Sequence, residues 1–128
     1  MKQLMMAIIA ALLLAACNAE PPSAIPYSAL PETGDPVRGA TLYAEDSSPL
    51  CTSCHVADAT GAPTLENYAQ EARSRVEGQS AREYTFYAIT EPWQHIVEGY
   101  GDAMPYSYDD DLSAQDIADL IAYLLQEE

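Results

Sequence analysis

The clearest helical pattern in the chain covers residues 113–125. Ser113 and Asp116 stand at the two positions of a capping box, and Leu112 is placed to pack on Ile117 as a hydrophobic staple. The apolar positions repeat at the i, i+3, i+4, i+7 spacing that gives a helix one buried face, and they are Ile117, Leu120, Ile121 and Leu124. This segment is therefore predicted to be an amphipathic helix.

Three further helices are predicted upstream. The first starts at an Asp35 N-cap followed by proline, a favourable pair for a first turn, and runs to about residue 45. The second covers about 65–76, where apolar residues recur at helical spacing. The third starts at the Ser80 N-cap, has a glutamate three residues on, and is ended by Pro92. Because no strand alternation or internal repeat is visible, the fold class is predicted to be all-α.

Residues 1–17 have the outline of a secretory signal: Lys2, an apolar stretch over 4–14, and then small residues. The apolar stretch is too short to span a membrane, which takes about 20 residues. Its end, Leu14-Ala15-Ala16-Cys17, resembles the lipobox of bacterial lipoproteins. That resemblance implies removal of residues 1–16 and a diacylglyceryl group on the Cys17 thiol. The alternative is an ordinary signal peptide with an incidental cysteine.

The stretch 18–36 holds five of the nine prolines and has no helical or strand period. Proline fixes φ and removes a hydrogen-bond donor. Residues 17–34 are therefore predicted to be an extended, semi-rigid tether that starts at the acylated cysteine and lifts a domain off the membrane. The remainder, residues 35–128, is enough for one domain. A domain of that size can only marginally build its own core, so a buried cofactor would help.

The charge balance indicates which binding partners are not expected. The chain has 20 Asp+Glu against 5 Lys+Arg, a formal net charge of −15. Binding to nucleic acid or to anionic lipid by charge needs clustered Lys and Arg, so neither is expected. An apolar content of 48% argues against wholesale disorder.

Residues 51–55 read Cys-Thr-Ser-Cys-His, and this CxxCH pattern is typical of c-type haem attachment. Two thiols two residues apart reach the two vinyl groups on one edge of a porphyrin and form thioethers. The adjacent histidine is then held beneath the iron as its proximal ligand. An export signal fits this chemistry, because haem is joined to such proteins outside the cytoplasm. We therefore predict one covalent haem c held by Cys51 and Cys54, with His55 on the iron.

Three other interpretations of the cysteine pair stay open. A thioredoxin-like redox pair would be expected beside a βαβ pattern, which the sequence lacks. A zinc site usually needs four ligands, and the chain after Cys17 offers two cysteines and two histidines, with Cys54 and His55 adjacent to each other. A structural disulfide would suit an oxidising compartment.

The sixth iron ligand has two candidates. Met104 is the one methionine left after the signal segment, and it lies in a glycine-bearing loop 49 residues after His55, just before Pro105. A thioether ligand raises the reduction potential relative to nitrogen-only ligation. The other candidate is His95, which would give a bis-histidine haem of lower potential. We favour Met104.

Residues 35–128 resemble the class I cytochrome c family. Gly39 and Tyr43 in the first predicted helix, with Leu120 and Tyr123 in the last, match positions where the terminal helices of that family cross. The resemblance implies a close helix–helix approach at the glycine and interlocked aromatic rings. It also implies an all-α domain packed around one haem c.

The segments around the two expected axial ligands also match the family. Residues 61–65 read Gly-Ala-Pro-Thr-Leu and resemble the segment after the proximal histidine. The match implies that the Pro63 carbonyl accepts the ring N–H of His55 and that Leu65 contacts the haem. Met104-Pro105 looks like the distal ligand pair of the family.

The stretch 84–125 is similar to cytochrome c domains fused to oxidase subunit II and to the monohaem lipoprotein subunits of alternative complex III. The shared part is the run from His95 to Tyr100. The family often has a small or polar residue where His95 stands, and a second proline where Tyr106 follows Pro105.

Together these features predict a one-electron carrier rather than an enzyme, because an iron with both axial positions filled has no open site for substrate. The expected place is the periplasmic or extracytoplasmic face of a membrane, anchored through Cys17. The acidic charge should direct the protein to redox partners with basic docking patches. A fixed subunit of a respiratory or photosynthetic complex would use the same chemistry. The alternatives are a haem sensor or haem enzyme with a labile sixth ligand, or a lipoprotein without haem.

Overall fold

The computed structural model describes residues 22–46, 50–58, 60–106 and 108–126, and over these ranges it contains helices and loops but no strand. The predicted all-α class is confirmed. The expectations for residues 1–16 and for Cys17 lie outside the described residues. The elements, in chain order, are η2 (Tyr27–Ala29), α2 (Pro36–Thr41), its π-helical continuation η3 (Leu42–Asp46), η4 (Cys51–Ser53), α3 (Tyr68–Ala72), α4 (Ala81–Thr90), η5 (Pro92–Gln94), α5 (Tyr108–Asp111) and α6 (Ala114–Leu124).

Three helix starts occur where the sequence predicts them. The Asp35 side chain accepts hydrogen bonds from the first amides of α2, and the Ser80 hydroxyl accepts one from the Glu83 amide. Ser113 and Asp116 form the complete capping box of α6, each side chain bonding the other's backbone amide. These caps satisfy amides that would otherwise have no partner in the first turn of a helix.

Two regions differ from the sequence expectation. The helix predicted over 65–76 is confined to α3. It starts only at Tyr68 because Asn67 adopts a left-handed backbone conformation with φ of 57°, through which no right-handed helix can pass. The acidic run 109–111 belongs to the short helix α5, which no helical period in the sequence predicts. α5 leads directly into the Ser113 cap, and the buried Tyr108 fixes its start against the core.

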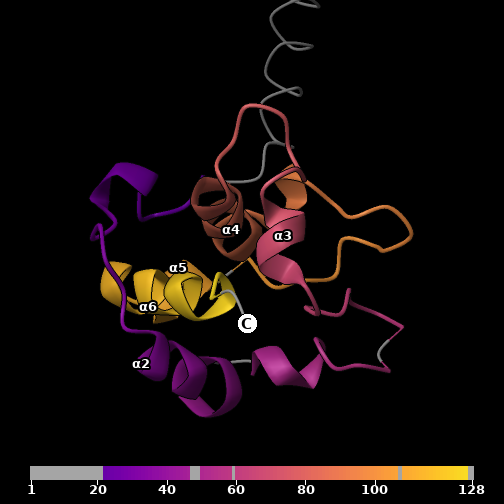
Figure 1. Ribbon diagram of the computed structural model, residues 1–128, viewed down its shortest axis with the longest axis horizontal. Coiled ribbons are helices and arrows are strands. Elements are labelled where there is room, and N and C mark those ends of the chain that lie inside the picture. Colours follow the sequence, from indigo (N-terminus) through magenta and orange to yellow (C-terminus); the bar gives the residue numbers. More distant parts are fainter. Residues whose placement is uncertain (1–21, 47–49, 59, 107, 127–128) are drawn as a thin grey trace, which may run out of the picture.

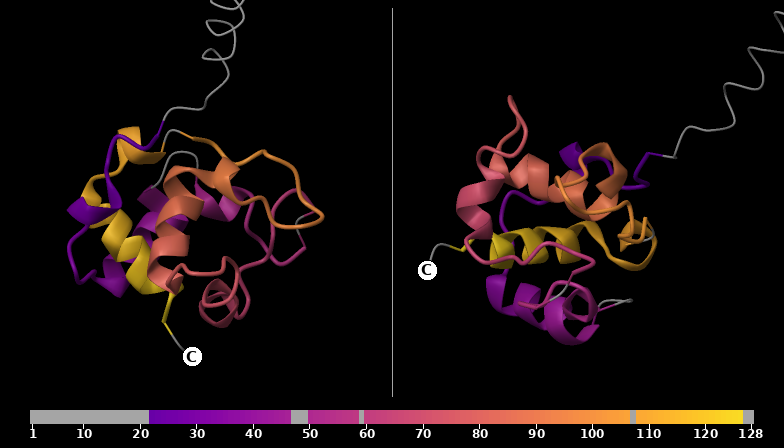
Figure 2. Two further views of the ribbon diagram at one scale, coloured as in Figure 1. Left: turned by 90° about the horizontal axis from the view of Figure 1, so that it is seen from above. Right: turned by 90° about the vertical axis from the view of Figure 1, so that its right-hand side faces the viewer.

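Helix α6 is the centre of the molecule, with α2 on one side and α4 on the other (Figures 1 and 2). Its apolar face supplies three of the eight core residues, and the predicted staple pair Leu112 and Ile117 is buried in the same core. The core consists of Leu42, Phe86, Ile89, Tyr108, Leu112, Ile117, Leu120 and Ile121.

The contact between α2 and α6 depends on glycine. A Cβ atom on Gly39 would lie 2.8 Å from the Cβ of Tyr123, and it would also clash with the Asp119 backbone. Gly34, just before α2, meets the α6 backbone equally closely, with an added Cβ 2.8 Å from the Asp119 nitrogen. The rings of Tyr43 and Tyr123 pack 5.5 Å apart beside this contact. The crossing implied by the resemblance is therefore confirmed.

A buried carboxylate reinforces the same crossing. Asp119 is 1% exposed, and its Oδ1 accepts hydrogen bonds from the Asp35 amide at 2.7 Å and from the Gln115 side chain at 2.8 Å. Its Oδ2 lies 3.3 Å from the Arg38 guanidinium, which also pairs with Asp116. The buried charge therefore has partners for both oxygens, as a buried charge requires.

The described part of the expected tether packs on the domain instead of standing away from it. We call residues 22–31 the N-terminal strap. The side chains of Ile25, Tyr27 and Leu30 lie against the core, and the Tyr27 ring is 5.4 Å from that of Phe86. Apolar residues spaced between the prolines make this possible, and the proline content alone does not reveal it. Among the described residues, no helix is long and apolar enough to cross a membrane.

Replacing Gly39 by alanine should lower the free energy of unfolding of the haem-loaded protein by about 3 kcal/mol, because the methyl group overpacks a backbone contact. Denaturant unfolding measures the change. Val37→Ala is the control, since Val37 is 77% exposed on the same helix and should change stability by less than about 0.5 kcal/mol. Equal effects of the two substitutions would contradict the close crossing.

The capping box predicts that the free energy of unfolding depends on pH in the acidic range. Burial alone would raise the pKa of Asp116, but hydrogen bonds from Ser113 and the Arg38 guanidinium outweigh it and hold the pKa below its ordinary value. The bonded carboxylate therefore stabilises the fold above the unfolded pKa of about 3.9, and this stabilisation is lost as the pH falls through the lower folded pKa. Asp116→Asn should make the loss of unfolding free energy below about pH 5 shallower. If Asp116→Asn leaves the pH dependence of the unfolding free energy unchanged, Asp116 is not the source of that dependence.

Candidate functional site

The residues singled out in the sequence line one cavity of about 260 Å³, whose walls are mostly apolar. One wall comes from η4 and the loop that follows it, up to residue 65. The opposite wall comes from residues 92–108, and α4 and α6 contribute Ile89, Leu120 and Leu124 to its inner surface. The structure therefore brings together the predicted site residues Cys51, Cys54, His55, Pro63, Leu65 and Met104, together with His95.

The CxxCH segment is a single tight turn. η4 contains Cys51, and the amides of Cys54 and His55 both bond the Cys51 carbonyl, at 3.2 and 2.9 Å. This turn places the two thiols and the imidazole close together along the rim of the cavity. The Tyr43 hydroxyl donates to the His55 carbonyl at 3.1 Å, so η3 fixes the end of the same turn. Burial raises the pKa of Tyr43 to about 12, which keeps the hydroxyl protonated as a donor at neutral pH.

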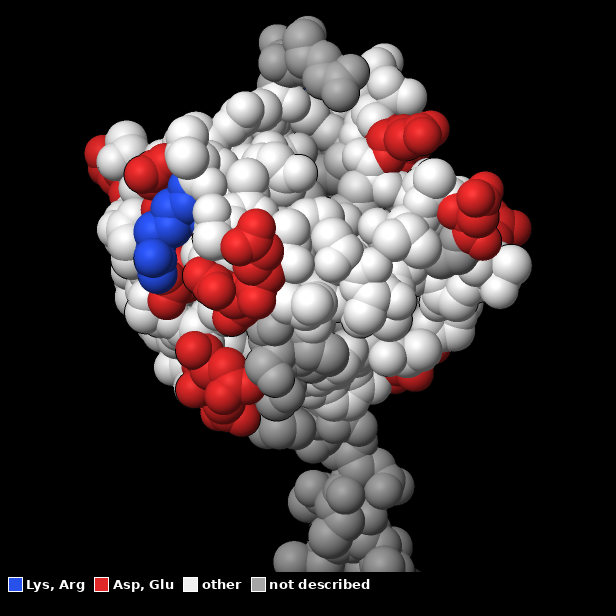
Figure 3. Space-filling view, turned by 90° about the horizontal axis from the view of Figure 1, so that it is seen from below, with Lys and Arg blue, Asp and Glu red and all other residues white. Residues whose placement is uncertain are grey.

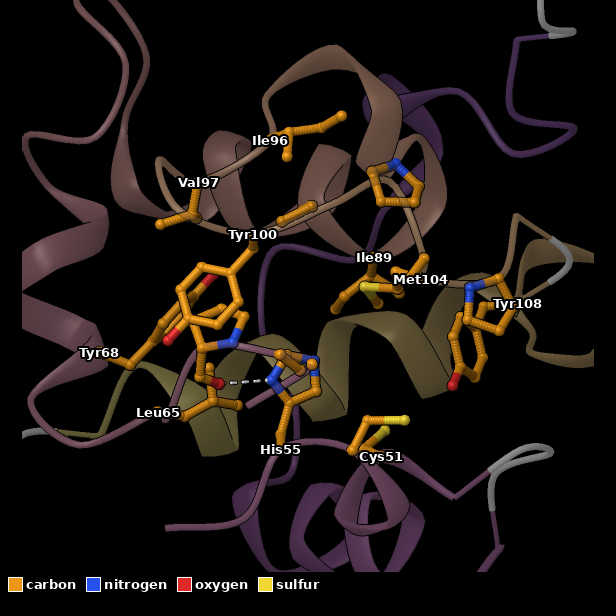
Figure 4. Close-up of a pocket in the computed structure, with 18 of the residues that line it drawn as sticks. Cys51, His55, Leu65, Tyr68, Ile89, Ile96, Val97, Tyr100, Met104 and Tyr108 are labelled. Carbon is orange, nitrogen blue, oxygen red and sulfur yellow. Dashed lines mark hydrogen bonds between the residues drawn. The ribbon is translucent and has the colours of Figure 1, made fainter. Parts of the chain in front are cut away.

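The His55 ring has a fixed orientation. Its Nδ1 lies 2.8 Å from the Pro63 carbonyl oxygen, the contact that the resemblance implied (Figure 4). A carbonyl can only accept, so Nδ1 carries the hydrogen and Nε2 keeps its lone pair. An imidazole held in this way presents Nε2 as a metal ligand with a defined direction.

Met104 points into the cavity from the wall opposite His55 (Figure 4). Its side chain is partly buried and packs against the hydrophobic core. His95 lines the edge of the same cavity but is exposed, and its ring packs edge-on against Tyr84 at 5.7 Å. The two candidates for the sixth ligand therefore differ in setting: the thioether belongs to the interior and the imidazole to the rim.

Sequence reasoning did not assign roles to the tyrosines of the cavity. Tyr68 lies against the wall near Leu65, and its hydroxyl donates to Thr85 on α4 at 3.1 Å. Burial raises the pKa of Tyr68 and raises that of Tyr108 to about 12. The cavity tyrosines Tyr68, Tyr84 and Tyr108 come from α3, α4 and α5. Helical spacing indicates that each packs inward, but it does not show that they share one cavity.

The donor set suits haem iron better than a bare metal ion. Over the described ranges, no cluster of three or more His, Cys, Asp or Glu side chains could hold a metal ion. Zinc usually needs four such ligands. An imidazole and a thioether facing each other across an apolar cavity, with two thiols at its rim, match the ligands and attachment points of haem c. The site therefore fits the predicted cofactor and disfavours the zinc interpretation.

Acidic side chains outnumber basic ones on the face of the molecule seen from below (Figure 3). Figure 3 shows acidic groups scattered around an uncharged central area, and the basic side chain seen on this face lies at one edge beside acidic groups. Two of the exposed large apolar residues, Leu50 and Ile96, line the cavity itself.

The fold and the site together define a helical domain of the c-type haem class: a CxxCH turn, an oriented histidine, and an apolar cavity between the CxxCH loop and the Met104 segment, closed on the inside by α4 and α6. The sequence profile of the cytochrome c family matches residues 36–128, and the chain belongs to that family. It binds haem c covalently and serves haem-based electron transfer, not enzymatic catalysis. Cytochrome c domains are typically exported to the periplasm or the extracellular side. Searches of the curated proteins and of the solved structures gave no significant match.

Tyr43→Phe should lower the free energy of unfolding by about 1 kcal/mol, because it removes the hydrogen bond to the His55 carbonyl and keeps the ring. Tyr123→Phe is the matched control, since that ring packs on Tyr43 and no hydrogen bond of its hydroxyl is seen among the described residues. Denaturant unfolding of the haem-loaded proteins compares the two. A Tyr123→Phe cost as large as that of Tyr43→Phe would argue against the bond.

Proposed function

We propose that the protein is a membrane-anchored carrier of single electrons, with haem attached to Cys51 and Cys54 and ligated by His55 and Met104. The observation that carries the proposal is the placement of His55 and Met104 on opposite walls of one apolar cavity. Haem bound there supplies a ferric–ferrous couple. The protein's part is to hold both iron ligands in place, so that little rearrangement accompanies the change of charge.

Each residue has a defined task in this proposal. The thiols of Cys51 and Cys54 form the thioethers, and the turn of η4 keeps them beside the histidine. The Pro63 carbonyl orients His55 and makes its Nε2 the ligand. Leu65 lines the same wall as an apolar contact that keeps water away. With His55 and Met104 both holding the iron, no ligand position would be left for a substrate.

Met104 is preferred to His95 as the sixth ligand because of their surroundings. Met104 packs on the core and faces His55, whereas His95 is exposed and its ring is engaged with Tyr84. A thioether ligand in an apolar setting also favours a higher reduction potential than a second imidazole would.

The proposed anchor is a lipid on Cys17. Cys17 lies six positions before Ser23, whose amide is hydrogen-bonded to the domain, and an extended chain of that length spans at most about 21 Å. A domain tied this closely stays near the membrane surface, on its periplasmic or extracytoplasmic side. The natural partners are therefore redox proteins at that surface, including the subunits of a respiratory or photosynthetic complex.

The surface charge indicates the kind of partner. After removal of residues 1–16 the chain keeps four arginines against 20 acidic residues. This charge attracts a basic docking patch over several ångströms and speeds encounter, while the apolar residues at the cavity mouth supply a small area of direct contact. Small contacts of this kind are typical of transient electron-transfer encounters.

Replacement of Met104 by alanine tests the ligand assignment. The reduced haem-loaded protein should bind carbon monoxide only after this substitution, because only then is an axial position open. The reduction potential should fall by on the order of 0.2 V. His95→Ala is the control and should change neither property. Carbon monoxide binding by the unaltered protein would favour a haem sensor or haem enzyme, and an effect of His95→Ala instead of Met104→Ala would assign the ligand to His95.

The anchor is tested by Cys17→Ser. The unaltered protein should stay with salt-washed membranes, and mass analysis should find an N-terminal peptide that begins with a lipid-modified Cys17. The variant should be recovered in the soluble fraction, because salt removes partners held by charge and the lipid is gone. An unmodified Cys17 peptide in the unaltered protein would contradict the proposal.

A further inference from the structure

The wall that carries Met104 is one continuous segment of 17 residues, 92–108. It supplies many of the cavity-lining residues, including Met104 and Pro105. Most hydrogen bonds seen within the segment close local turns, such as the bond from the Tyr100 amide to the Val97 carbonyl at 3.0 Å. Side-chain packing within the segment, such as that of Trp93 on Tyr106 at 4.9 Å, and hydrogen bonds at its two ends contribute to holding it over the cavity.

The first end meets the N-terminal strap at Glu91. The Ser23 amide donates to Glu91 Oε1 at 2.9 Å, and the other carboxylate oxygen accepts from the Gln94 side chain in η5. Glu91 is 8% exposed and stands directly before Pro92. One largely buried carboxylate thus joins the strap to the first turn of the segment.

The second end meets the strap one residue further on. The Ala24 amide donates to Asp109 Oδ2 at 2.6 Å. Asp109 follows Tyr108, which is buried in the core and lines the cavity. Neighbouring Cα atoms lie about 3.8 Å apart, so two successive amides of the strap draw together two carboxylates that are 18 residues apart in the sequence.

The strap is itself firmly held, so it can act as a brace. Besides the core contacts of its apolar side chains, the Tyr27 ring packs 6.3 Å from that of Tyr87, and Arg82 donates to the Pro31 carbonyl. The Ser23 hydroxyl accepts from the Ile25 amide at 3.2 Å, which shapes the turn that presents the two amides. Bonds from a fixed backbone to charged acceptors are stronger than neutral ones.

We propose that Glu91 and Asp109 are positioning residues for Met104: by binding the Ser23 and Ala24 amides they close the two ends of segment 92–108 and keep the thioether on the haem iron. The physical gain is entropic, since a loop whose ends are fixed has fewer conformations in which Met104 is withdrawn. The inference rests on the proposed ligation by Met104. It gives the strap a role in the redox site as well as in leading the chain from the proposed anchor.

The test uses the full-length, haem-loaded ferric protein in detergent, with imidazole as the probe of an open axial position. Glu91→Ala and Asp109→Ala should each raise the apparent imidazole affinity about tenfold, the effect of losing one hydrogen bond to a charged group. In both variants the far-red sulfur-to-iron charge-transfer band, which reports the methionine ligand, should also weaken more on warming than it does in the unaltered protein. Glu91→Gln keeps an acceptor oxygen in place and should restore most of the unaltered behaviour.

Arg82→Ala is the matched control. It loosens the far end of the strap at Pro31 and touches neither end of segment 92–108. It should lower global stability without changing imidazole affinity by more than about twofold. An equal rise in affinity for Arg82→Ala would show general loosening and overturn the proposal.

The remaining outcomes separate this inference from the function on which it rests. A charge-transfer band in the unaltered protein, with imidazole affinity unchanged in both alanine variants, would overturn the role of Glu91 and Asp109 alone. Absence of that band in the unaltered protein would instead overturn the ligation by Met104. Should Glu91→Ala not fold, Asp109→Ala decides the question, because Asp109 is half-buried at the surface and its loss leaves the core intact.

Discussion

The close contact of α2 with α6 is the constraint on which the rest of the structure depends. Gly39 allows the two backbones to meet, and the buried Asp119 carboxylate ties the start of α2 to the middle of α6. The CxxCH turn follows α2 in the chain, and the Met104 segment precedes α6. Crossing these two helices therefore places the His55 and Met104 walls on either side of one cavity, with α4 completing it.

Much of this could be predicted from the sequence, because the strongest signals are local. The caps at Asp35, Ser80 and Ser113 and the apolar period of α6 depend on neighbouring residues, and the structure reproduces them. The CxxCH turn also follows from a short spacing, whereas the Pro63 partner of His55 is implied by the family resemblance. The short α3 could not be predicted in the same way, because its limit depends on the left-handed conformation of Asn67.

The strap shows where sequence reasoning ends. Its prolines suggest an extended tether, yet three of its apolar side chains pack on the core and two of its amides donate to carboxylates far away in the chain. Such contacts join residues 68 and 85 positions apart, and no local pattern encodes them. No local pattern predicts the hydrogen bond from the Tyr43 hydroxyl to the His55 carbonyl either, because it joins η3 to the CxxCH turn. A segment with an expected role in anchoring thus also forms part of the domain.

The redox site depends above all on Cys51 and Cys54 holding the cofactor beside His55. The most direct test is the intact mass of the denatured protein after maturation in a haem-attaching host, followed by peptide mapping. Covalent attachment predicts a mass increase of one haem that survives denaturation and maps to the peptide containing residues 51–55. Loss of haem on denaturation, or its recovery on a peptide without both cysteines, would contradict the account.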